Sequence, residues 1–189
     1  MKQIGILGGT FDPPHLGHLI IAETVRTTLS LDEIWFIPTN EPPHKNKAMS
    51  TGQDRMNMLK LAIEDNHYFK INDIEMKRLG KSYTFDTMNI LINENQDCEF
   101  FFIIGADMVQ YLPKWSRIDE LIKKISFVGV QRQGYVLESA YPVLKVDIPI
   151  IDISSTMIRN QLATQSSVKY LMPDSVDTYI KENQLYENH

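Results

Sequence analysis

Cysteine is almost absent from this chain: Cys98 is the only one among 189 residues. A single cysteine excludes an intramolecular disulfide framework and any multi-cysteine metal site, and its place beside an apolar run favours a packing role. The sequence also lacks an apolar stretch of the ~18 residues that a membrane-spanning helix needs, and it shows no N-terminal signal pattern. We therefore expect a cytoplasmic protein that does not contact a membrane.

An excess of positive charge is also missing. The chain has 19 Lys and Arg against 24 Asp and Glu, which gives a net charge of −5. A general nucleic-acid binder needs basic patches, so we expect no nucleic-acid partner. Hydrophobic residues at 43% and charged residues at 23% are typical of a globular protein, and the length suits a single domain over residues 1–189.

Two common phosphate-binding signatures are absent as well. The chain contains neither G-x-G-x-x-G, the dinucleotide fingerprint, nor glycines followed by G-K-[ST], the end of a P-loop. If the protein handles phosphate, it must do so with a different motif.

The chain instead carries GGTFDPPHLGH at residues 8–18, directly after the apolar run 4–7 and before the apolar run 19–22. This order predicts a strand, a tight turn at Gly8 and Gly9, and then a helix. Glycine lets backbone N–H groups approach a ligand without a Cβ in the way, and the N-terminus of a helix attracts anions. The segment is therefore suited to binding phosphate.

His15 and His18 are three residues apart, so they fall on one face of the first helical turn. Such a pair can donate to phosphate oxygens, form half of a metal site or serve a structural role. A zinc site would need further ligands, and Asp12 is the only close candidate. We therefore expect phosphate contacts and no protein-bound metal.

Strands and helices alternate along most of the chain. Buried apolar runs predict strands at 4–7, 34–38, 100–105 and 127–130, and a more alternating run predicts an edge or half-buried strand at 69–74. Amphipathic spacing predicts helices at 16–29, 50–63, 84–92 and 118–124. We expect Ser50 and Gln53 to form a capping box at the start of the second helix.

The last third of the sequence is less regular. It predicts a strand at 144–153, which contains Pro149, and helices at 154–162 and 173–183. Strands separated by helices imply right-handed parallel crossovers. We therefore predict an α/β fold, a Rossmann-like doubly wound parallel sheet with a helical C-terminal cap. Such sheets bind ligands at the carboxyl ends of their strands.

A second informative segment is ISSTMIR at residues 153–159. Ser154, Ser155 or Thr156 can cap the helix that follows, and the N–H groups and hydroxyls at that end suit phosphate oxygens. Arg159 adds a charged fork one turn along. Alone, this pattern is more typical of an ordinary cap and a surface arginine, but beside the first motif it favours phosphate binding.

Together, these segments resemble the nicotinate-nucleotide adenylyltransferases of the nucleotidyltransferase superfamily, whose signature is a HIGH-type box. The long form of the first motif is more specific than H-x-G-H alone, and I-S-S-T-x-I-R matches the family segment at every fixed position. The resemblance covers nearly the whole chain. It implies transfer of the adenylyl group of ATP to nicotinate mononucleotide, giving nicotinic acid adenine dinucleotide and pyrophosphate, with Mg²⁺ carried by the ATP.

The resemblance also implies roles for individual residues. The catalytic residues would be His15, His18 and Arg159. Contacts to ATP are implied for Gly8, Gly9, Thr10, Phe11, Gly105, Asp107, Arg132, Ser154, Ser155 and Thr156. Asp107 follows a buried strand and would bind the ribose, although a helix N-cap is the commoner role for such an aspartate. Arg132 is explained equally well as a solvated surface charge.

Contacts to nicotinate mononucleotide are implied for Asn40, His44, Lys45, Tyr83, Thr84 and Trp115. Tyr83 and Thr84 precede a helix whose N–H groups favour a carboxylate, and Trp115 can stack on a flat ring. An ordinary helix cap and a core tryptophan are the alternatives.

Other functions remain open. The acceptor could be nicotinamide mononucleotide or phosphopantetheine, the nucleotide could be CTP, or the protein could be a sensor that binds ATP without turnover. The intact H-x-G-H and Arg159 count against the sensor. Related bacterial enzymes are often dimers or tetramers, so a homo-oligomer is a further expectation.

Overall fold

The fold is built on a single parallel sheet. The computed structural model describes residues 1–40, 48–78, 80, 82–131, 137–149 and 151–187. Its six strands lie in the order β3-β2-β1-β4-β5-β6 and are all parallel. They span Lys2–Gly9 (β1), Glu33–Pro38 (β2), Phe69–Ile71 (β3), Cys98–Gly105 (β4), Ser126–Val130 (β5) and Val143–Val146 (β6). This order confirms the predicted Rossmann-like, doubly wound sheet.

The strand order reverses between β1 and β4. The register of this pair runs from Lys2↔Cys98 to Leu7↔Ile103, yet β1 continues to Gly9 and β4 to Gly105. The last residues of the two strands are therefore unpaired with each other. In open α/β sheets this point, at the carboxyl ends of the strands, is where ligands bind.

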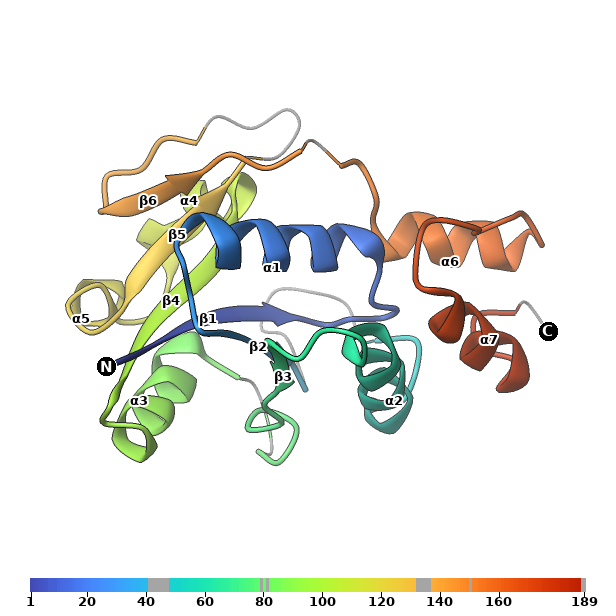
Figure 1. Cartoon of the computed structure of the whole chain (residues 1–189), viewed down its shortest axis with the longest axis horizontal. Coiled ribbons are helices and arrows are strands. Elements are labelled where there is room, and N and C mark those ends of the chain that lie inside the picture. Colours follow the sequence, from blue (N-terminus) through green and yellow to red (C-terminus); the bar gives the residue numbers. More distant parts are fainter. Residues whose placement is uncertain (41–47, 79, 81, 132–136, 150, 188–189) are drawn as a thin grey trace.

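Helices cover both faces of the sheet (Figure 1). They span Leu16–Thr28 (α1), Gly52–Ile63 (α2), Thr84–Glu94 (α3), Ala106–Tyr111 (α4), Ile118–Leu121 (α5), Ser155–Ala163 (α6) and Asp174–Glu182 (α7), with a 3-10 turn at Leu112–Lys114 (η1). One buried cluster joins α1 and α2 to the sheet, and a second joins α3, α4 and α5 to it. Alternate residues of β1 divide between these clusters, Ile6 entering one and Leu7 the other.

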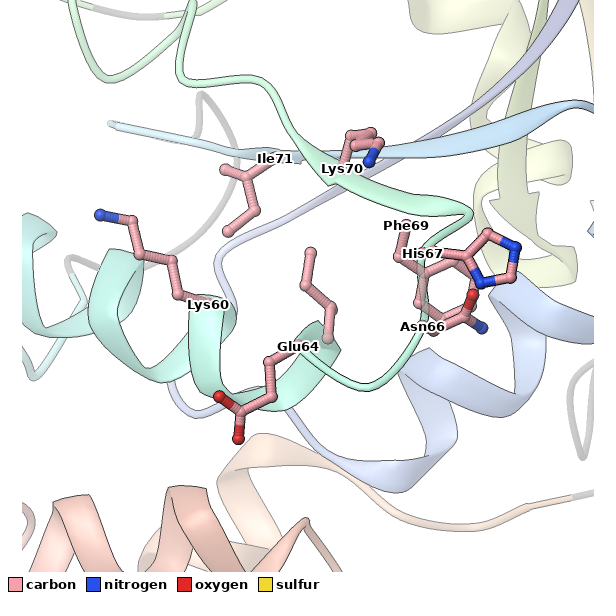
Figure 2. A pocket seen from close by; sticks show the side chains of 8 residues that line it. Lys60, Glu64, Asn66, His67, Phe69, Lys70 and Ile71 are labelled. Carbon is pink, nitrogen blue, oxygen red and sulfur yellow. The ribbon is translucent and has the colours of Figure 1, made fainter.

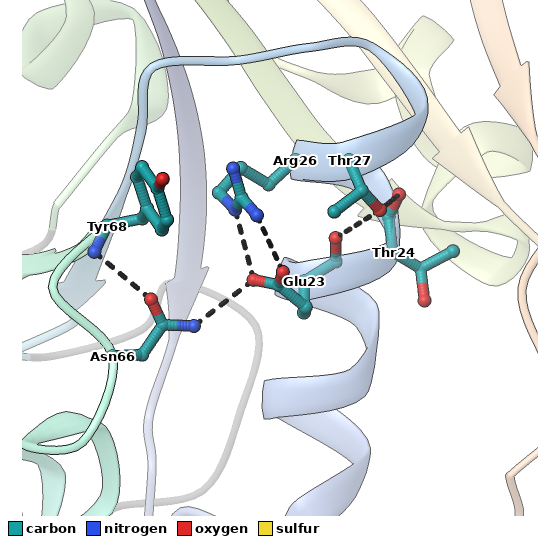
Figure 3. Close-up of polar contacts among 6 residues, drawn as sticks. All are labelled: Glu23, Thr24, Arg26, Thr27, Asn66 and Tyr68. Carbon is teal, nitrogen blue, oxygen red and sulfur yellow. Dashed lines mark hydrogen bonds and ion pairs between the residues drawn. The ribbon is translucent and has the colours of Figure 1, made fainter.

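Polar contacts also fix α1 against the turn that leads into β3 (Figure 3). Arg26 donates to both carboxylate oxygens of Glu23, at 3.0 and 2.7 Å, and its guanidinium lies 3.9 Å from the centre of the Tyr68 ring. Asn66 donates to Glu23 (3.1 Å) and accepts from the Tyr68 N–H (3.0 Å). These bonds connect the first helix to the sheet edge at β3.

The predicted helical cap forms around a third buried cluster. Its members come from α2, α6, α7 and their flanking segments: Met58, Ile158, Val168, Met172, Val176, Ile180 and Tyr186. Figure 1 shows α6 and α7 past the end of β1, beside α2. The cap therefore lies next to the carboxyl edge of the sheet.

Several predicted bounds were wrong for local reasons. β3 ends at Ile71 because the Asn72 side chain accepts from the Ile74 N–H (3.1 Å) and starts a turn. β6 ends at Val146, before Pro149, which has no N–H to donate to a ladder. α5 ends at Leu121 rather than at 124. α4 was not predicted, because it has only six residues and its N-cap, Gly105, makes no side-chain cap bond.

The predicted capping box at Ser50 and Gln53 was also wrong. The side chain of Thr51 caps α2 by accepting from the Asp54 N–H (3.1 Å). Ser50 is engaged elsewhere, since its hydroxyl donates to the carboxylate of Asp12. A tertiary partner has therefore displaced the local one.

Candidate active site

The first motif begins inside the sheet. Gly8 and Gly9 are the last residues of β1, opposite Ile37 and Pro38 of β2, so the predicted tight turn at the glycine pair was wrong. The chain bends at Phe11, whose φ of 51° is left-handed. Gly9 is needed for packing, because a Cβ there would lie 3.0 Å from the Phe11 ring. Gly8 is exposed and has the open approach that a phosphate contact requires.

The ring of Phe11 belongs to the core. It is 1% exposed and packs edge-on against His18, with ring centres 5.0 Å apart. What Phe11 can offer a nucleotide is therefore its backbone. Its side chain instead packs against the imidazole of His18.

His15 and His18 form a stacked pair. Their ring centres are 3.7 Å apart with 26° between the planes, and His15 is 6% exposed. The His15 N–H donates to Nδ1 of His18 (3.2 Å), so the neutral His18 ring carries its proton on Nε2 as a donor. Gly17 allows this packing, because a Cβ there would lie 3.0 Å from the His15 ring.

The first turn of α1 is partly occupied. The Leu16 N–H donates to the carbonyl of Leu171 (2.9 Å), and the His18 N–H donates to the carbonyl of His15 (3.0 Å). Two of the four N–H groups of this turn are therefore engaged by backbone carbonyls. The helix end therefore offers a ligand fewer N–H groups than a free first turn would.

The second motif lies directly against the first. Ser154, one of the three predicted candidates for the cap, caps α6 by accepting from the Met157 N–H (3.2 Å). The Ser155 hydroxyl donates to the carbonyl of Pro13 (2.8 Å), and Nη1 of Arg159 donates to the carbonyl of Asp12 (2.6 Å). These bonds join residues more than 140 positions apart. The two segments, distant in the sequence, therefore lie together in the folded protein.

Arg159 is positioned by two contacts. Beside its bond to Asp12, its Nη2 donates to the hydroxyl of Thr156 (3.2 Å), one turn back on α6. Thr156 is exposed and Arg159 is half-buried. A guanidinium has five N–H donors, so these two bonds fix its orientation without using all of them.

The end of β4 lies on the other side of the strand reversal. Gly105 is the N-cap of α4, and Asp107 is the second residue of that helix. The alternative role for Asp107 as the N-cap itself is therefore wrong. Its half-buried carboxylate belongs to the first turn of α4, at the same edge of the sheet as Gly9.

The predicted acceptor residues are more scattered. Asn40 donates to the carbonyl of Arg78 (3.0 Å). Tyr83 is 42% exposed and is the N-cap of α3, and Thr84 is the first residue of that helix. This N-terminus lies at the carboxyl edge of the sheet, because a helix that follows a parallel strand starts at that end. His44, Lys45 and Arg132 lie outside the described residues.

Trp115 follows η1 and is half-buried. Its ring meets Phe102 and Phe127 edge-on, with centres 5.9 Å apart in both pairs. Phe102 reaches the end of β1, since its Cζ lies 3.7 Å from the place that a Cβ on Gly8 would occupy. Trp115 is thus partly a packing residue, and it lies near the strand reversal.

Two buried charged residues were missed by sequence reasoning. Arg55 is 2% exposed, and its Nη1 donates to the carbonyls of Thr10 (2.9 Å) and Thr39 (2.7 Å). Burial lowers its pKa, and the nearby carboxylate of Asp12 opposes that shift. The signal was available, because Arg55 lies on the same helical stripe as Leu59 and the other apolar residues of α2.

The second missed residue is Glu75, which is 8% exposed. It accepts from the hydroxyl of Thr87 (2.8 Å). Burial raises the pKa of Glu75, and hydrogen bonds from Thr87 and Thr39 oppose the rise. Its contacts link the end of β2 to the first turns of α3.

Two hollows of the described surface lie away from the predicted site residues. One of about 310 Å³ lies between α2 and the β3 segment and is lined by Lys60, Ile63, Glu64, Asn66, His67, Phe69, Lys70 and Ile71. In Figure 2 the charged ends of Lys60 and Glu64 point in different directions, so the hollow shows no convergent charge. None of the predicted site residues lines it.

Within the described ranges, no group of three or more His, Cys, Asp or Glu is placed to hold a metal ion. The same part of the chain contains no helix long and apolar enough to cross a membrane.

Several known proteins are similar to this chain over most of its length. A family model described as cytidylyltransferase-like matches residues 6–161. A protein of Oceanobacillus iheyensis named probable nicotinate-nucleotide adenylyltransferase is 56% identical over 98% of this chain and 97% of its own length. The nicotinate-nucleotide adenylyltransferase of Bacillus subtilis is 51% identical over the full length of both chains.

Solved structures show the same fold. One is the nicotinic acid mononucleotide adenylyltransferase of Plasmodium falciparum, complexed with APC in one structure and with NaAD in another. Both match with a TM-score of 0.82 at 21% identity over 98% of each chain. At that identity the similarity concerns the fold alone.

Proposed function

This chain belongs to the cytidylyltransferase-like family and, within it, to the nicotinate-nucleotide adenylyltransferases, and on that premise we propose its reaction. It transfers the adenylyl group of ATP to nicotinate mononucleotide, forming nicotinic acid adenine dinucleotide and pyrophosphate. The single observation that carries the assignment to the site is the contact between the two motifs, through Ser155 to Pro13 and Arg159 to Asp12.

The reaction requires no covalent bond between the protein and the substrates. An oxygen of the acceptor's phosphate attacks the α-phosphorus of ATP in line, forming a new P–O bond. The bond from the α-phosphorus to the bridging oxygen breaks, and pyrophosphate leaves with that electron pair. The attacking phosphate is already ionised, so no general base is required. The protein aligns the reactants and neutralises the spreading negative charge.

We assign that neutralisation to three side chains. His15 and His18 form a stacked pair at the N-terminus of α1, and Nε2–H of His18 is a donor for a phosphate oxygen. Arg159 is oriented by Asp12 and Thr156 and keeps further N–H groups for the phosphates. Gly8 lets a phosphate approach the end of β1 closely. Mg²⁺ enters with the ATP and is held mainly by phosphates and water.

The acceptor side rests on α3 and Trp115. A carboxylate is stabilised at the N-terminus of α3, where Tyr83 and Thr84 lie. Trp115, whose ring packs against Phe102 of β4, offers an aromatic face. An amide has no charge to gain from the helix end, so the acid is preferred over the amide.

The test is to identify the product by mass. The protein is mixed with Mg²⁺ and either ATP or CTP, and with nicotinate mononucleotide, nicotinamide mononucleotide or phosphopantetheine. We expect nicotinic acid adenine dinucleotide and pyrophosphate from ATP and the acid. Equal use of the amide would remove the acceptor assignment, product from CTP would change the nucleotide, and binding of ATP without product would make the protein a sensor.

A further inference from the structure

The carboxylate of Asp12 is a buried junction inside the first motif. Asp12 is 3% exposed, and its oxygens accept from the N–H groups of Met49 (2.7 Å) and Ser50 (3.3 Å) and from the Ser50 hydroxyl. A fourth donor is the hydroxyl of Tyr186, 2.6 Å from Oδ1. A carboxylate with four donors is held in one place, because moving it breaks several charge-assisted bonds at once.

Tyr186 reaches this junction from the far end of the cap. It follows α7, is 9% exposed, and belongs to the cluster formed by α2, α6 and α7. Its hydroxyl also lies 3.2 Å from the Ser50 hydroxyl. Burial and the charge of Asp12 raise the pKa of Tyr186, so the hydroxyl stays protonated and remains a donor.

The backbone at Asp12 is also bonded to the proposed catalytic groups. Its carbonyl accepts from Arg159, and the carbonyl of the next residue, Pro13, accepts from Ser155. His15 follows two residues later and stacks on His18. A shift of Asp12 would therefore move the catalytic arginine and the histidine pair together.

We propose that Tyr186 is a positioning residue for adenylyl transfer, acting through Asp12 on His15, His18 and Arg159; this inference rests on the proposed function. Tyr186 lies outside residues 6–161, the part of the chain that the family model matches. The cap would then do more than stabilise the fold, because it supplies a donor that fixes the geometry of the phosphate site.

Tyr179 provides a matched control. Its hydroxyl also connects the cap to α2, accepting from Asn57 (3.0 Å) and donating to Asp54 (2.9 Å). Neither contact reaches the first motif. Tyr186→Phe and Tyr179→Phe each remove one hydroxyl and leave the ring, so they differ chiefly in the contact to Asp12.

The test compares both variants with the wild-type protein under saturating ATP and nicotinate mononucleotide, at a temperature where all three are folded by circular dichroism. We expect Tyr186→Phe to lower kcat about 10- to 100-fold, since small misplacements of reacting groups have effects of that size, with each KM within about threefold. Tyr179→Phe should keep kcat within about twofold, although both variants lower Tm.

A second measurement separates positioning from plain structural support. In an Asp12→Asn background, Tyr186→Phe should lower kcat much less than in the wild type, because the two residues act as one unit. Equal kcat for Tyr186→Phe and Tyr179→Phe, or additive effects with Asp12→Asn, would overturn the inference while leaving the reaction intact. A wild-type protein that forms no dinucleotide would instead remove the proposed function.

Discussion

The phosphate side and the acceptor side of the candidate site are built differently. On the phosphate side, side chains from residues 154–159 bond directly to backbone carbonyls of the first motif, and Asp12 anchors that motif from within. On the acceptor side, Tyr83 is exposed. The side-chain contacts described for Trp115 are ring contacts, to Phe102 and Phe127. The difference follows from the chemistry, because charge neutralisation requires fixed donors, whereas ring stacking tolerates small shifts.

The largest effect is expected for a substitution on the phosphate side. His18→Ala should lower kcat about 10²- to 10³-fold, the usual result of removing one preorganised donor, with a change in ATP affinity of only a few-fold. Steady-state kinetics and ATP titration measure the two quantities. His67→Ala is the control, since His67 is exposed and its ring lies against Tyr68 beside β3, away from the candidate site. An unchanged rate for His18→Ala would exclude His18 from catalysis.

Arg55 connects the ends of two neighbouring strands, because one of its nitrogens bonds to Thr10 after β1 and to Thr39 after β2. Arg55→Met should lower the free energy of unfolding by about 3 kcal/mol, since it removes two charge-assisted bonds and leaves two carbonyls without their donor. Urea denaturation measures the loss. A decrease no larger than that of a typical surface substitution would show that the two strand ends do not depend on this bridge.

Trp115 tests whether the acceptor side binds a ring. Trp115→Leu should raise the KM for nicotinate mononucleotide about 3- to 10-fold, as expected from one aromatic contact, and leave the KM for ATP nearly unchanged. Trp35→Leu is the control, because Trp35 also packs edge-on, against Phe100, within β2. If Trp115→Leu raised both KM values equally, the ring would be a packing residue only.

The smallest expected effect concerns Glu75, near the start of α3. Its folded-state pKa is raised above the usual 4.5 by burial, so the folded protein binds the proton more tightly than the unfolded chain does. The stabilisation from the protonated form is complete below the unfolded pKa and is lost as pH rises through the folded pKa. Glu75→Gln should therefore gain stability relative to the wild type across that window, measured by urea denaturation at several pH values. If the two proteins differed in unfolding free energy by the same amount at every pH, the raised pKa of Glu75 would be contradicted.

Sequence patterns predicted most strands and helices well, because the spacing of apolar residues that indicates them is local. Each of the five strands with an apolar or alternating run formed close to its predicted start, and α6 was capped by Ser154, one of the three expected candidates. Prediction failed where a distant partner intervened. The Ser50 hydroxyl bonds to Asp12 instead of capping α2, and the turn lies at Phe11, whose ring is buried, instead of at Gly8 and Gly9.

The residues that sequence reasoning missed differ in how clearly the sequence signals them. Arg55 interrupts an apolar stripe and could have been recognised as a buried charge. Tyr186 gives no such signal, since it is a single aromatic residue in the polar stretch ENQLYENH. Its role depends on how α7 packs on α2, which no local pattern encodes.

The amino-acid sequence by itself determined the alternation of strands and helices and the two segments suited to phosphate, because periodicity and short motifs act over a few residues. Only the tertiary structure decided which donors are already engaged, such as the Leu16 N–H on Leu171 and Arg159 on Asp12. Those bonds join residues more than 140 positions apart, so they exist only once the sheet and the cap have packed against each other.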